Sequence, residues 1–375
     1  MRRQHGLAAL VAGIFGTCAT AFGGPGWGVF NPLPGGNGSA TSDSLGNTIS
    51  ADGQVAVGTV YLGGEYMAAA WRPDGVTLLP GPLGQSHGAH AVSADGSIIG
   101  GSLERTGPSW AATFWNSSGG GSYVRQTMAD VPGGGDSSRI LGLTADGAVG
   151  VGWGQSSSGG IAARWTNAQG AGSPGTAIAN PPGLTGVASA TAVSDDGSVI
   201  VGTIGATSFR HSGGTVQVNG SFGSSCGVLG VSGDGTKMVG YSVLGRTFAT
   251  LWTDAGPSLL TGLAGAPDNA STRAIDISGD GSVIVGQMSV GSEIDAVVWL
   301  GGQPRLLADL LTESGADLTG WRVSHVSGVS ADGTVIVGHA RNPDGQLQGY
   351  VAVIPSPGMT GLLVAAAALA SRRRR

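Results

Sequence analysis

The stretch that decides the fold is residues 192–202, which read AVSDDGSVIVG. Variants of this phrase occur seven times, and each contains an Asp-Gly pair whose aspartates are Asp52, Asp95, Asp146, Asp196, Asp234, Asp280 and Asp332. Successive aspartates are 43, 51, 50, 38, 46 and 52 residues apart. Self-similarity at a period of about 47 residues is typical of a solenoid or a propeller.

Three further positions repeat in register with the aspartate. Three residues before it lies an aliphatic side chain, in Ile49, Val92, Leu143, Val193, Val231, Ile277 and Val329. Two residues before it lies a hydroxyl, in Ser50, Ser93, Thr144, Ser194, Ser232, Ser278 and Ser330. Six residues after it lies a glycine, in Gly58, Gly101, Gly152, Gly202, Gly240, Gly286 and Gly338. Such a register indicates one structural unit used seven times.

The phrase has the chemistry of a tight hairpin. An Asp side chain can accept a backbone N–H two residues further on, and the glycine that follows it can adopt positive φ. The run after the turn, such as Val199-Ile200-Val201, is β-branched throughout, as expected of a strand buried on both faces. We therefore interpret the seven aspartates as structural turn residues rather than catalytic or metal-binding ones.

Each repeat contains a predicted third strand, and most repeats contain a fourth. An aromatic residue 18 to 20 positions after the aspartate ends the third strand, in Trp71, Trp115, Trp165, Trp252, Trp299 and, in the seventh repeat, Tyr350. The fourth repeat has His211 in this place. We interpret these aromatic residues as fillers between sheets and His211 as a replacement for one. Fourth strands are expected at Val76 to Leu79, Ser258 to Leu260 and Arg305 to Leu311.

Four short antiparallel strands in about 47 residues make the blade of a propeller. We therefore predict an all-β fold, a seven-bladed β-propeller of four-stranded antiparallel blades. The last repeat ends after its third strand, Gly349 to Ile354, whereas Gly28 to Leu33 resembles a lone fourth strand. We expect this N-terminal strand to complete the last blade, because closure of the ring removes open sheet edges.

The N-terminal residues 1–21 have the three regions of a secretory signal peptide. Arg2 and Arg3 precede the apolar stretch from Leu7 to Phe15, and cleavage is expected after Ala21, with Ala19 as the other small residue of the site. Lipoprotein and twin-arginine signals match less well. The sequence therefore predicts export.

The C-terminal residues 355–375 form a second targeting signal. Pro355 and Pro357 precede twelve mostly apolar residues, Met359 to Ala370, and the chain ends in Arg372, Arg373, Arg374 and Arg375. Twelve helical residues span roughly 18 Å, which is short of a hydrocarbon core of about 30 Å, so membrane contact is expected to be transient. The terminal arginines would stay on the cytoplasmic side during export.

This tail resembles the PEP-CTERM sorting signal, which implies processing by a membrane-embedded exosortase. This chain departs from the family at Ser356, where the family has Glu. A weak membrane anchor that is never cleaved is the alternative.

Residues 28–354 resemble the HAF-repeat family of extracellular proteins, through residues 192–202 and Ala296-Val297-Val298-Trp299. The resemblance implies a secreted, propeller-like surface protein without an established activity. The hairpin is also similar to the repeats of TolB-type propellers, which bind partners and catalyse nothing. It departs from the sialidase Asp-box, because Gly directly follows Asp. The expected domains are the signal peptide (1–21), the propeller (22–354) and the sorting tail (355–375).

Composition excludes several classes of protein. Glycine (72) and proline (17) are abundant in the 375 residues, but 41% hydrophobic residues suffice for a core. Of 18 Lys and Arg residues, six lie at the two ends, which leaves 12 against 23 Asp and Glu and argues against nucleic-acid binding. Cys18 lies in the predicted signal peptide, so Cys226 is left without an intramolecular disulfide partner. We expect Cys226 to be a small buried apolar residue, and a reactive or intermolecular thiol is the alternative.

No catalytic, metal or cofactor site stands out. A glycosidase needs two carboxylates close together, but the four glutamates and twelve non-repeat aspartates are scattered. His87 and His90 are expected on opposite faces of a strand, which argues against a shared metal. The best candidates for an exposed binding face, where rings could stack on sugars, are Tyr61, Tyr66, Trp110, Tyr123, Trp153 and Trp321. The alternative is that several of these rings pack beneath loops.

We therefore expect a non-catalytic binding or structural module at the cell surface or outside the cell. Its expected partners are the export machinery, an exosortase-like enzyme and an extracellular glycan or protein. The alternative is a secreted carbohydrate-active enzyme, a hydrolase or lyase with its site at the central mouth of the ring. Carboxylates clustered at the axis would favour the enzyme, and an aromatic patch on a rim would favour binding.

Overall fold

The computed structural model describes residues 26–35, 44–107, 109–157, 159–218, 220 and 222–355. The predicted signal peptide with Ala19 and Ala21, and the tail residues Pro357 and Arg372 to Arg375, lie outside this range. Pro355, where the predicted tail begins, is the last described residue and is buried.

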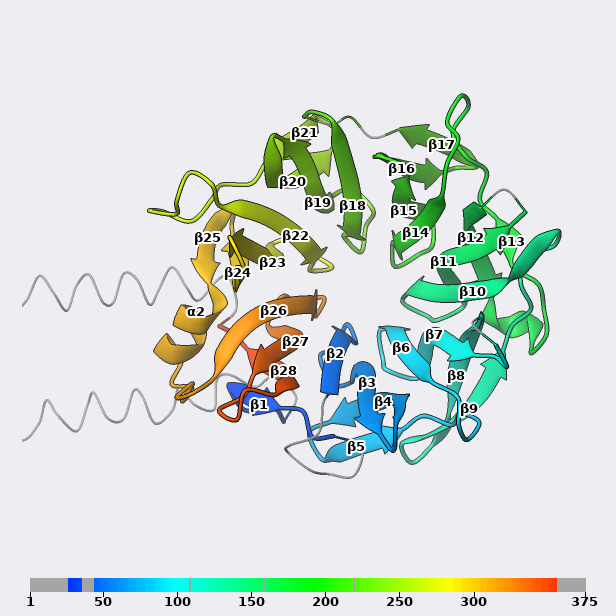
Figure 1. Cartoon of the computed structure of the whole chain (residues 1–375), viewed down its shortest axis with the longest axis horizontal. Helices are drawn as coiled ribbons and strands as arrows, with labels where there is room; N and C mark the ends of the chain where they lie inside the picture. Colours follow the sequence, from blue (N-terminus) through cyan, green and yellow to red (C-terminus); the bar gives the residue numbers. More distant parts are fainter. Residues whose placement is uncertain are drawn as a thin grey trace, which may run out of the picture.

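Seven four-stranded antiparallel sheets surround a central channel (Figure 1). Blade 1 consists of β2 (Ser44–Ile49), β3 (Ala56–Leu62), β4 (Glu65–Arg72) and β5 (Gly75–Leu78). Blade 2 consists of β6 (His87–Val92), β7 (Ile98–Glu104), β8 (Trp110–Gly119) and β9 (Ser122–Thr127). Blade 3 consists of β10 (Gly134–Leu143), β11 (Val149–Ser156), β12 (Gly159–Thr166) and β13 (Thr176–Ala177). The first strand of each blade faces the channel.

Blades 4 to 6 follow the same order around the ring. Blade 4 consists of β14 (Ala188–Val193), β15 (Val199–Ile204), β16 (Thr207–Ser212) and β17 (Thr215–Val218). Blade 5 consists of β18 (Ser225–Val231), β19 (Met238–Leu244), β20 (Arg246–Thr253) and β21 (Gly256–Leu259). Blade 6 consists of β22 (Ser271–Ile277), β23 (Val283–Val290), β24 (Glu293–Leu300) and β25 (Gln303–Leu306). Blade 7 consists of β26 (Arg322–Val329), β27 (Val335–Arg341), β28 (Leu347–Val353) and β1 (Phe30–Pro32). The predicted seven-bladed β-propeller is confirmed.

The Ser-x-Asp-Gly turn joins the first two strands of every blade. In blade 5 the Asp234 carboxylate accepts the Thr236 N–H at 2.9 Å and the Ser232 hydroxyl at 2.6 Å. The Ser232 oxygen in turn accepts the Lys237 N–H at 3.0 Å, and Gly235 has a φ of +71°. All seven turns repeat these three bonds. The hydroxyl therefore orients the carboxylate and also caps the next strand.

Backbone hydrogen bonds link these turns to one another around the channel. Each runs from an N–H in one turn to a carbonyl in the next: Asp52 to Ala94 at 3.2 Å, Ala94 to Ala145 at 2.8 Å, Ala145 to Asp195 at 3.0 Å, Asp195 to Gly233 at 2.9 Å, Gly233 to Gly279 at 3.0 Å, Asp280 to Ala331 at 3.3 Å and Ala331 to Ala51 at 3.1 Å. The last bond joins blade 7 to blade 1, so the belt is closed. We call this end of the channel the turn end.

The repeated glycine six residues after the aspartate lies opposite a bulge. Every channel-facing strand shifts register by one residue at the same place, as between Val228 and Gly230 in blade 5. The bulge pushes a carbonyl toward the glycine, so that a Cβ on Gly240 would lie 1.9 Å from the Gly227 oxygen. The corresponding distances in the seven blades are 1.9 to 2.1 Å. Only glycine fits there.

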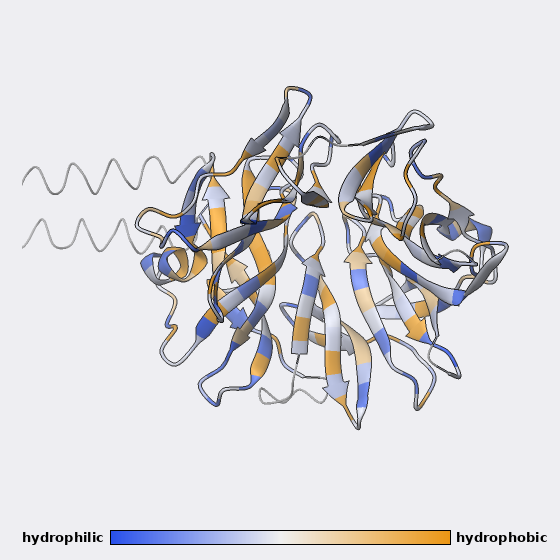
Figure 2. Ribbon diagram, turned by 45° about the horizontal axis from the view of Figure 1, so that its top comes forward, coloured by the Kyte–Doolittle hydropathy of each residue, from blue (hydrophilic) through white to orange (hydrophobic). Residues whose placement is uncertain are grey.

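The repeated tryptophans pack between blades and bond to the connection that enters each blade. They are 0 to 2% exposed. Their indole N–H groups donate to carbonyls at 2.5 to 3.0 Å, from Trp71 to Pro34, Trp115 to Pro80, Trp165 to Ala129, Trp252 to Gly220 and Trp299 to Thr261. In blade 4 His211 is half-buried, and Phe209 is the buried aromatic of that strand. Figure 2 shows hydrophobic and polar segments distributed along the strands of the whole ring.

The N-terminal strand closes the ring, as predicted. Phe30, Asn31 and Pro32 pair antiparallel with Ala352, Val351 and Tyr350 of β28. Beyond β1, the Leu33 N–H donates to the Gly349 carbonyl at 2.8 Å, and the Leu33 side chain is fully buried against the cores of blades 1 and 7. Blade 7 is therefore built from both ends of the propeller.

One predicted strand was wrong. The prediction placed a strand from Arg305 to Leu311, but β25 ends at Leu306 and a short helix, α2 (Leu307–Glu313), follows it. Leu307, Leu310 and Leu311 are buried, and their i, i+3, i+4 spacing places them on one face of a helix. This face packs into the core between blades 6 and 7.

Removal of β1 should destabilise the propeller. A chain that starts at residue 39 loses the β28 pairing and the burial of Leu33, together worth about 4 kcal/mol. We expect its Tm, measured by circular dichroism, to fall by about 10 °C relative to a chain that starts at residue 22 and keeps β1. Equal melting of the two chains would show that the closure contributes no stability.

The bulge glycine should be intolerant of even a methyl group. Gly240→Ala places a Cβ against the backbone of β18, and we expect a loss of about 3 kcal/mol in urea unfolding. Gly262→Ala is the matched control, because Gly262 has open space around its Cβ position and no positive φ. The explanation fails if both variants unfold at the wild-type urea concentration.

Candidate functional site

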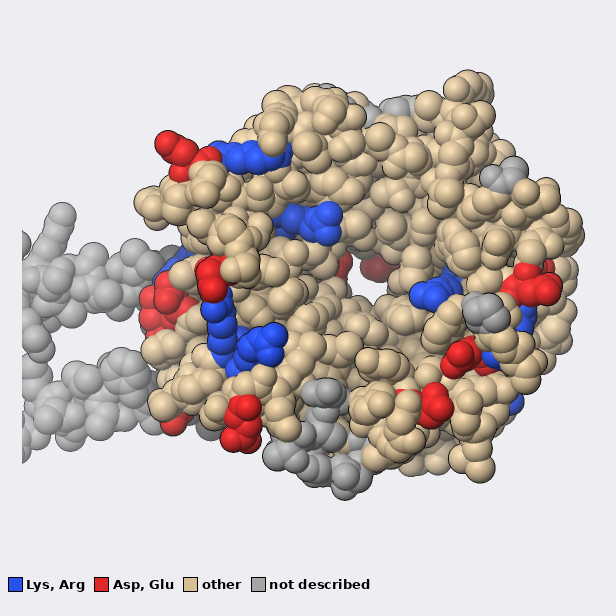
Figure 3. All heavy atoms as spheres, viewed as in Figure 1, with Lys and Arg blue, Asp and Glu red and all other residues tan. Residues whose placement is uncertain are grey.

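The central channel is lined by the first strand of each blade. Its middle section has a volume of about 320 Å³ and is lined by Asn47, His90, Thr191, Asp276 and Ser327 among others. A smaller section of about 150 Å³ lies at the turn end, where Asp195 and Asp276 are the lining carboxylates. Figure 3 shows acidic groups deep inside the opening.

Polar side chains in the channel tie each blade to the next. Asn47 donates its amide to the Ala89 carbonyl at 2.7 Å, and the Thr191 hydroxyl donates to the Val228 carbonyl at 2.8 Å. Asp276 accepts the Ile277 N–H at 2.8 Å and, from blade 7, the Val329 N–H at 3.0 Å. Burial raises the pKa of Asp276 to about 6, and the two amide donors only partly oppose this shift. These three side chains therefore already link neighbouring blades through hydrogen bonds.

His87 and His90 do not share a site. His87 is 1% exposed and its Nδ1 accepts the Ala68 N–H of blade 1 at 2.9 Å. His90 lines the channel, with Nε2 at 3.0 Å from the Ser102 hydroxyl. Burial is the main reason that the pKa of each is lowered to about 4, so both are neutral at pH 7. Within the described ranges no group of three or more His, Cys, Asp or Glu residues is placed to hold a metal.

Cys226 is a free, buried cysteine, 3% exposed, in the core between blades 4 and 5. Its sulfur lies 3.3 Å from the Ser208 hydroxyl.

A larger pocket of about 650 Å³ lies beside the channel, where blades 2, 3 and 4 meet. We call it the aromatic pocket; its lining residues are Ser109, Trp110, Asp136, Ser137, Arg139, Leu141, Trp153, Gln155 and Ser189. Leu141 also lines the middle of the channel, so the two spaces adjoin. Arg139 lies four residues before the end of β10 at Leu143, which at about 3.3 Å per residue puts the pocket roughly 13 Å or more from the turn end.

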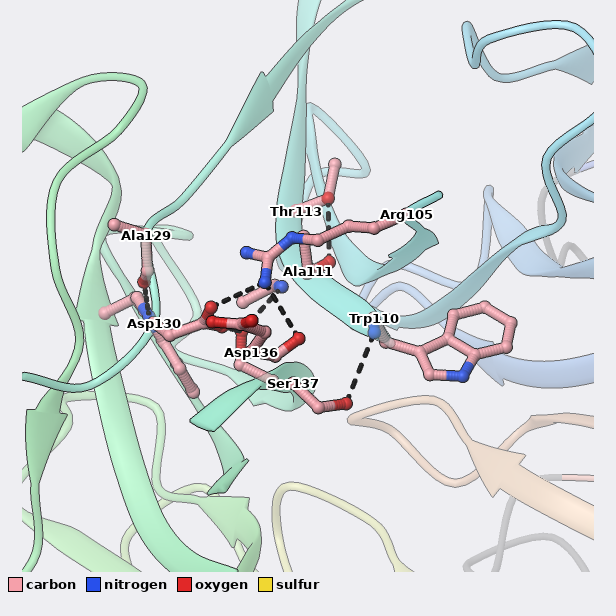
Figure 4. Close-up of polar contacts among 11 residues, drawn as sticks. Arg105, Trp110, Ala111, Thr113, Ala129, Asp130, Asp136 and Ser137 are labelled. Carbon is pink, nitrogen blue, oxygen red and sulfur yellow. Dashed lines mark hydrogen bonds and ion pairs between the residues drawn. The ribbon is translucent and has the colours of Figure 1, made fainter. Parts of the chain in front are cut away.

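Stacking and hydrogen bonds fix the walls of the aromatic pocket. The Arg139 guanidinium carbon lies 4.5 Å from the centre of the Trp110 ring, and Arg139 pairs with Trp153 across the β10–β11 ladder. Arg105 donates to the Asp130 carboxylate and to the Asp136 carbonyl (Figure 4). The backbone N–H of Trp110 donates to the Ser137 hydroxyl at 3.2 Å. The Trp110 indole points away from this ion pair. These bonds therefore hold the segment around Asp136 and Ser137 in place, and the Trp110 indole lines the aromatic pocket without taking part in them.

The other aromatic candidates lie elsewhere. Tyr61 and Tyr66 form an exposed pair in blade 1, 43% and 52% exposed, with ring centres 5.2 Å apart. Trp321 is half-buried against Phe30. Tyr123 was wrongly predicted as a surface ring, since it is 7% exposed and donates its hydroxyl to the Gly96 carbonyl at 2.8 Å. Of the six candidates, the structure brings together Trp110 and Trp153.

Sequence reasoning missed Arg139 and Gln155. The position seven residues before each turn aspartate is not the same residue throughout the ring, being Leu45, Gly88, Arg139, Ser189, Gly227, Arg273 and His325. It therefore escapes a search for repeats. The sequence signal that could have identified Arg139 is the appearance of arginine at a register position that is uncharged in most other blades.

Known structures resemble this chain in fold. No protein-family model matches it, and no curated protein does. An oligogalacturonate lyase from Vibrio parahaemolyticus is 10% identical over 87% of this chain and 96% of its own, with a TM-score of 0.54. A prolyl endopeptidase is 12% identical over 91% of this chain and 53% of its own, with a TM-score of 0.55.

The β-propeller domain of the Trilobed protease from Pyrococcus furiosus is 8% identical, over 83% of this chain and 95% of its own, with a TM-score of 0.51. This chain spans about half the length of the prolyl endopeptidase and 62% of TolB from Acinetobacter baumannii. At these identities the likeness shows a shared propeller fold alone. None of the helices in the described part of the chain is long and apolar enough to cross a membrane.

Asp276 should make stability depend on pH in a direction opposite to most carboxylates. Its folded pKa, about 6, exceeds the ordinary 3.8, so the folded state favours the neutral form. The stability of the wild type relative to Asp276→Asn should therefore rise as pH falls from 7 to below 4.5, by up to about 3 kcal/mol. Urea unfolding across this range measures the difference.

Asp344→Asn is the control for this measurement, because Asp344 is exposed in the loop between β27 and β28. Its difference from the wild type should stay constant over the same pH range. Parallel pH profiles for the wild type and Asp276→Asn would contradict the assignment.

Proposed function

We propose that this chain is a non-catalytic extracellular binding module that holds a glycan in the aromatic pocket. The observation that carries the proposal is that Trp110 and Trp153, from different blades, line one space of about 650 Å³ together with Arg139 and Gln155. Aromatic faces pack against the apolar faces of sugar rings, and a few polar groups fix their orientation. The volume is within the range of about 300 to 1,000 Å³ usual for small-molecule sites.

The charges around this pocket support binding rather than hydrolysis. Of its nine lining residues one is a carboxylate, Asp136, which is exposed. Hydrolysis of a glycosidic bond by the common route needs two carboxyl groups about 5 to 9.5 Å apart on either side of the bond. The pocket therefore offers contact surface without the acid and base.

The order of signals in the sequence supports a location at the cell surface or outside the cell. We propose that residues 1–21 are removed after Ala21 by the export machinery. The tail from Pro355 to Arg375 would then contact the membrane transiently until an exosortase-like enzyme processes it. A rigid ring with a pocket on one side suits a displayed receptor or a scaffold in the extracellular matrix.

A secreted carbohydrate-active enzyme is the second candidate. Asp195 and Asp276 both line the channel at the turn end, and burial raises the pKa of each. Their section of about 150 Å³ is small for a sugar ring and its substituents. Release of reducing ends from a polysaccharide, abolished by Asp276→Asn in a protein that still folds, would establish the enzyme instead.

Trp110 should dominate glycan binding. We expect Trp110→Ala to weaken retention in affinity gels that contain bacterial and plant polysaccharides by at least about tenfold, since a stacked ring contributes about 1.4 kcal/mol or more. Tyr66→Ala is the control, because Tyr66 is an exposed ring outside the pocket. Equal retention of both variants and the wild type would refute the assignment of the pocket.

A further inference from the structure

We infer that the glycan held in the aromatic pocket is anionic, a sugar chain that carries carboxylate or sulfate groups. The inference rests on the proposed function and adds the ligand's charge. It comes from two arginines that the repeat does not require, Arg139 and Arg273. Both stand seven residues before the turn aspartate, in blades 3 and 6.

Their register position on the first strand of each blade places both arginines toward the end of the channel opposite the turn end. Arg139 of blade 3 and Ser189 of blade 4 occupy the same register position, and both line the aromatic pocket. Arg273 and His325 occupy this position in blades 6 and 7, and no blade has an acidic residue there. Figure 3 shows basic groups bordering the opening of the channel on the face that it displays. An acidic protein thus has a basic lining at this end.

The guanidinium of each arginine lies over an aromatic ring from the preceding blade. The Arg139 guanidinium carbon is 4.5 Å from the centre of the Trp110 ring, and that of Arg273 is 4.4 Å from the centre of the Tyr241 ring. A guanidinium over a ring is restrained in position, and its N–H groups can still donate to a ligand. A planar fork held in this way suits two acceptor oxygens of one anionic group.

Neither arginine has an anionic partner in the part of the chain that the structure describes. In the described ranges the ion pairs are Arg105 with Asp130, Arg305 with Glu313 and Arg322 with Glu293. The Nε of Arg139 is buried without a hydrogen-bond partner, and burial lowers the pKa of this guanidinium. Asp136, the one carboxylate of the pocket, is exposed three residues away and forms no ion pair with it. A partly desolvated, unpaired cation is unfavourable, and a bound anion would offset that penalty.

The surroundings of Arg139 favour a sugar as the carrier of the anion. Trp110 and Trp153 supply apolar faces, and Gln155 supplies an amide for hydroxyl groups. A small inorganic anion would leave most of the 650 Å³ unused.

The experiment is a calorimetric titration of the exported protein with three polysaccharides: alginate, which carries carboxylates, dextran sulfate, which carries sulfates, and neutral dextran. We expect at least one anionic polymer to bind about tenfold more tightly than dextran or better, and to weaken when NaCl rises from about 0.05 to about 0.5 M. Preference for alginate assigns carboxylates as the source of charge, and preference for dextran sulfate assigns sulfates.

Arg139→Gln should abolish this preference. Arg246→Gln is the matched control, because Arg246 stacks on Phe248 at 4.6 Å in the same manner but lines neither the aromatic pocket nor the channel. If Arg139→Gln fails to fold by circular dichroism, competition on the wild type decides the matter. A monosaccharide with the preferred anionic group, glucuronate for alginate or glucose 6-sulfate for dextran sulfate, should displace the polymer at concentrations where glucose does not.

Two failures are distinguishable. Equal binding of dextran and the anionic polymers, equal effects of the two arginine substitutions, or equal competition by glucose and the anionic monosaccharide would overturn the anionic ligand and leave a glycan-binding pocket in place. Absence of binding to the three polymers and to the wider polysaccharide panel would overturn the proposed function itself.

Discussion

The belt of backbone hydrogen bonds that joins the seven Ser-x-Asp-Gly turns is the constraint on which the rest of the structure depends. A closed belt requires that every turn reach the same radius and height around the channel, which seven different turns could not do. The hydroxyl, the carboxylate and the glycine therefore recur in all seven repeats, since together they set one turn geometry. The bulge, its facing glycine and the buried tryptophan continue the same unit outward, from the channel to the space between blades.

This constraint acts at one end of the channel, so the other end is free to differ between blades. At the turn end the repeated hydroxyl and carboxylate side chains already accept hydrogen bonds from backbone N–H groups. Seven residues further back along each first strand, the side chain changes from glycine to leucine, serine, histidine or arginine. The aromatic pocket and its arginine lie at this variable end, where a substitution leaves the belt intact. Chemical specificity can therefore be built there without altering the fold.

The sequence predicts the parts of this protein that repeat, because seven copies of one signal outweigh the ambiguity of each copy. The number of blades, the hairpin turns and the closing N-terminal strand could all be predicted in this way. The helix after β25 could not, because Leu307, Leu310 and Leu311 occur once and fit either a strand or a helix until packing decides.

The pocket was only half predictable. Trp110 and Trp153 stand out as aromatic residues outside the repeat, but their convergence with Arg139 depends on how neighbouring blades face each other. Tyr123 stands out equally and is buried, because Gly96 lies where its hydroxyl can donate. A single sequence contains no signal that separates these two outcomes.

Hydrogen exchange of the turn amides tests the central claim most directly. The amides of Ala94, Ala145, Asp195, Gly233 and Ala331 lie in surface turns but donate to the belt. If the belt holds the ring together, they should exchange as slowly as the strands beside them, with the free energy of global unfolding. Fast exchange of these five amides, while the strands stay protected, would show that the blades hold the ring together without the belt.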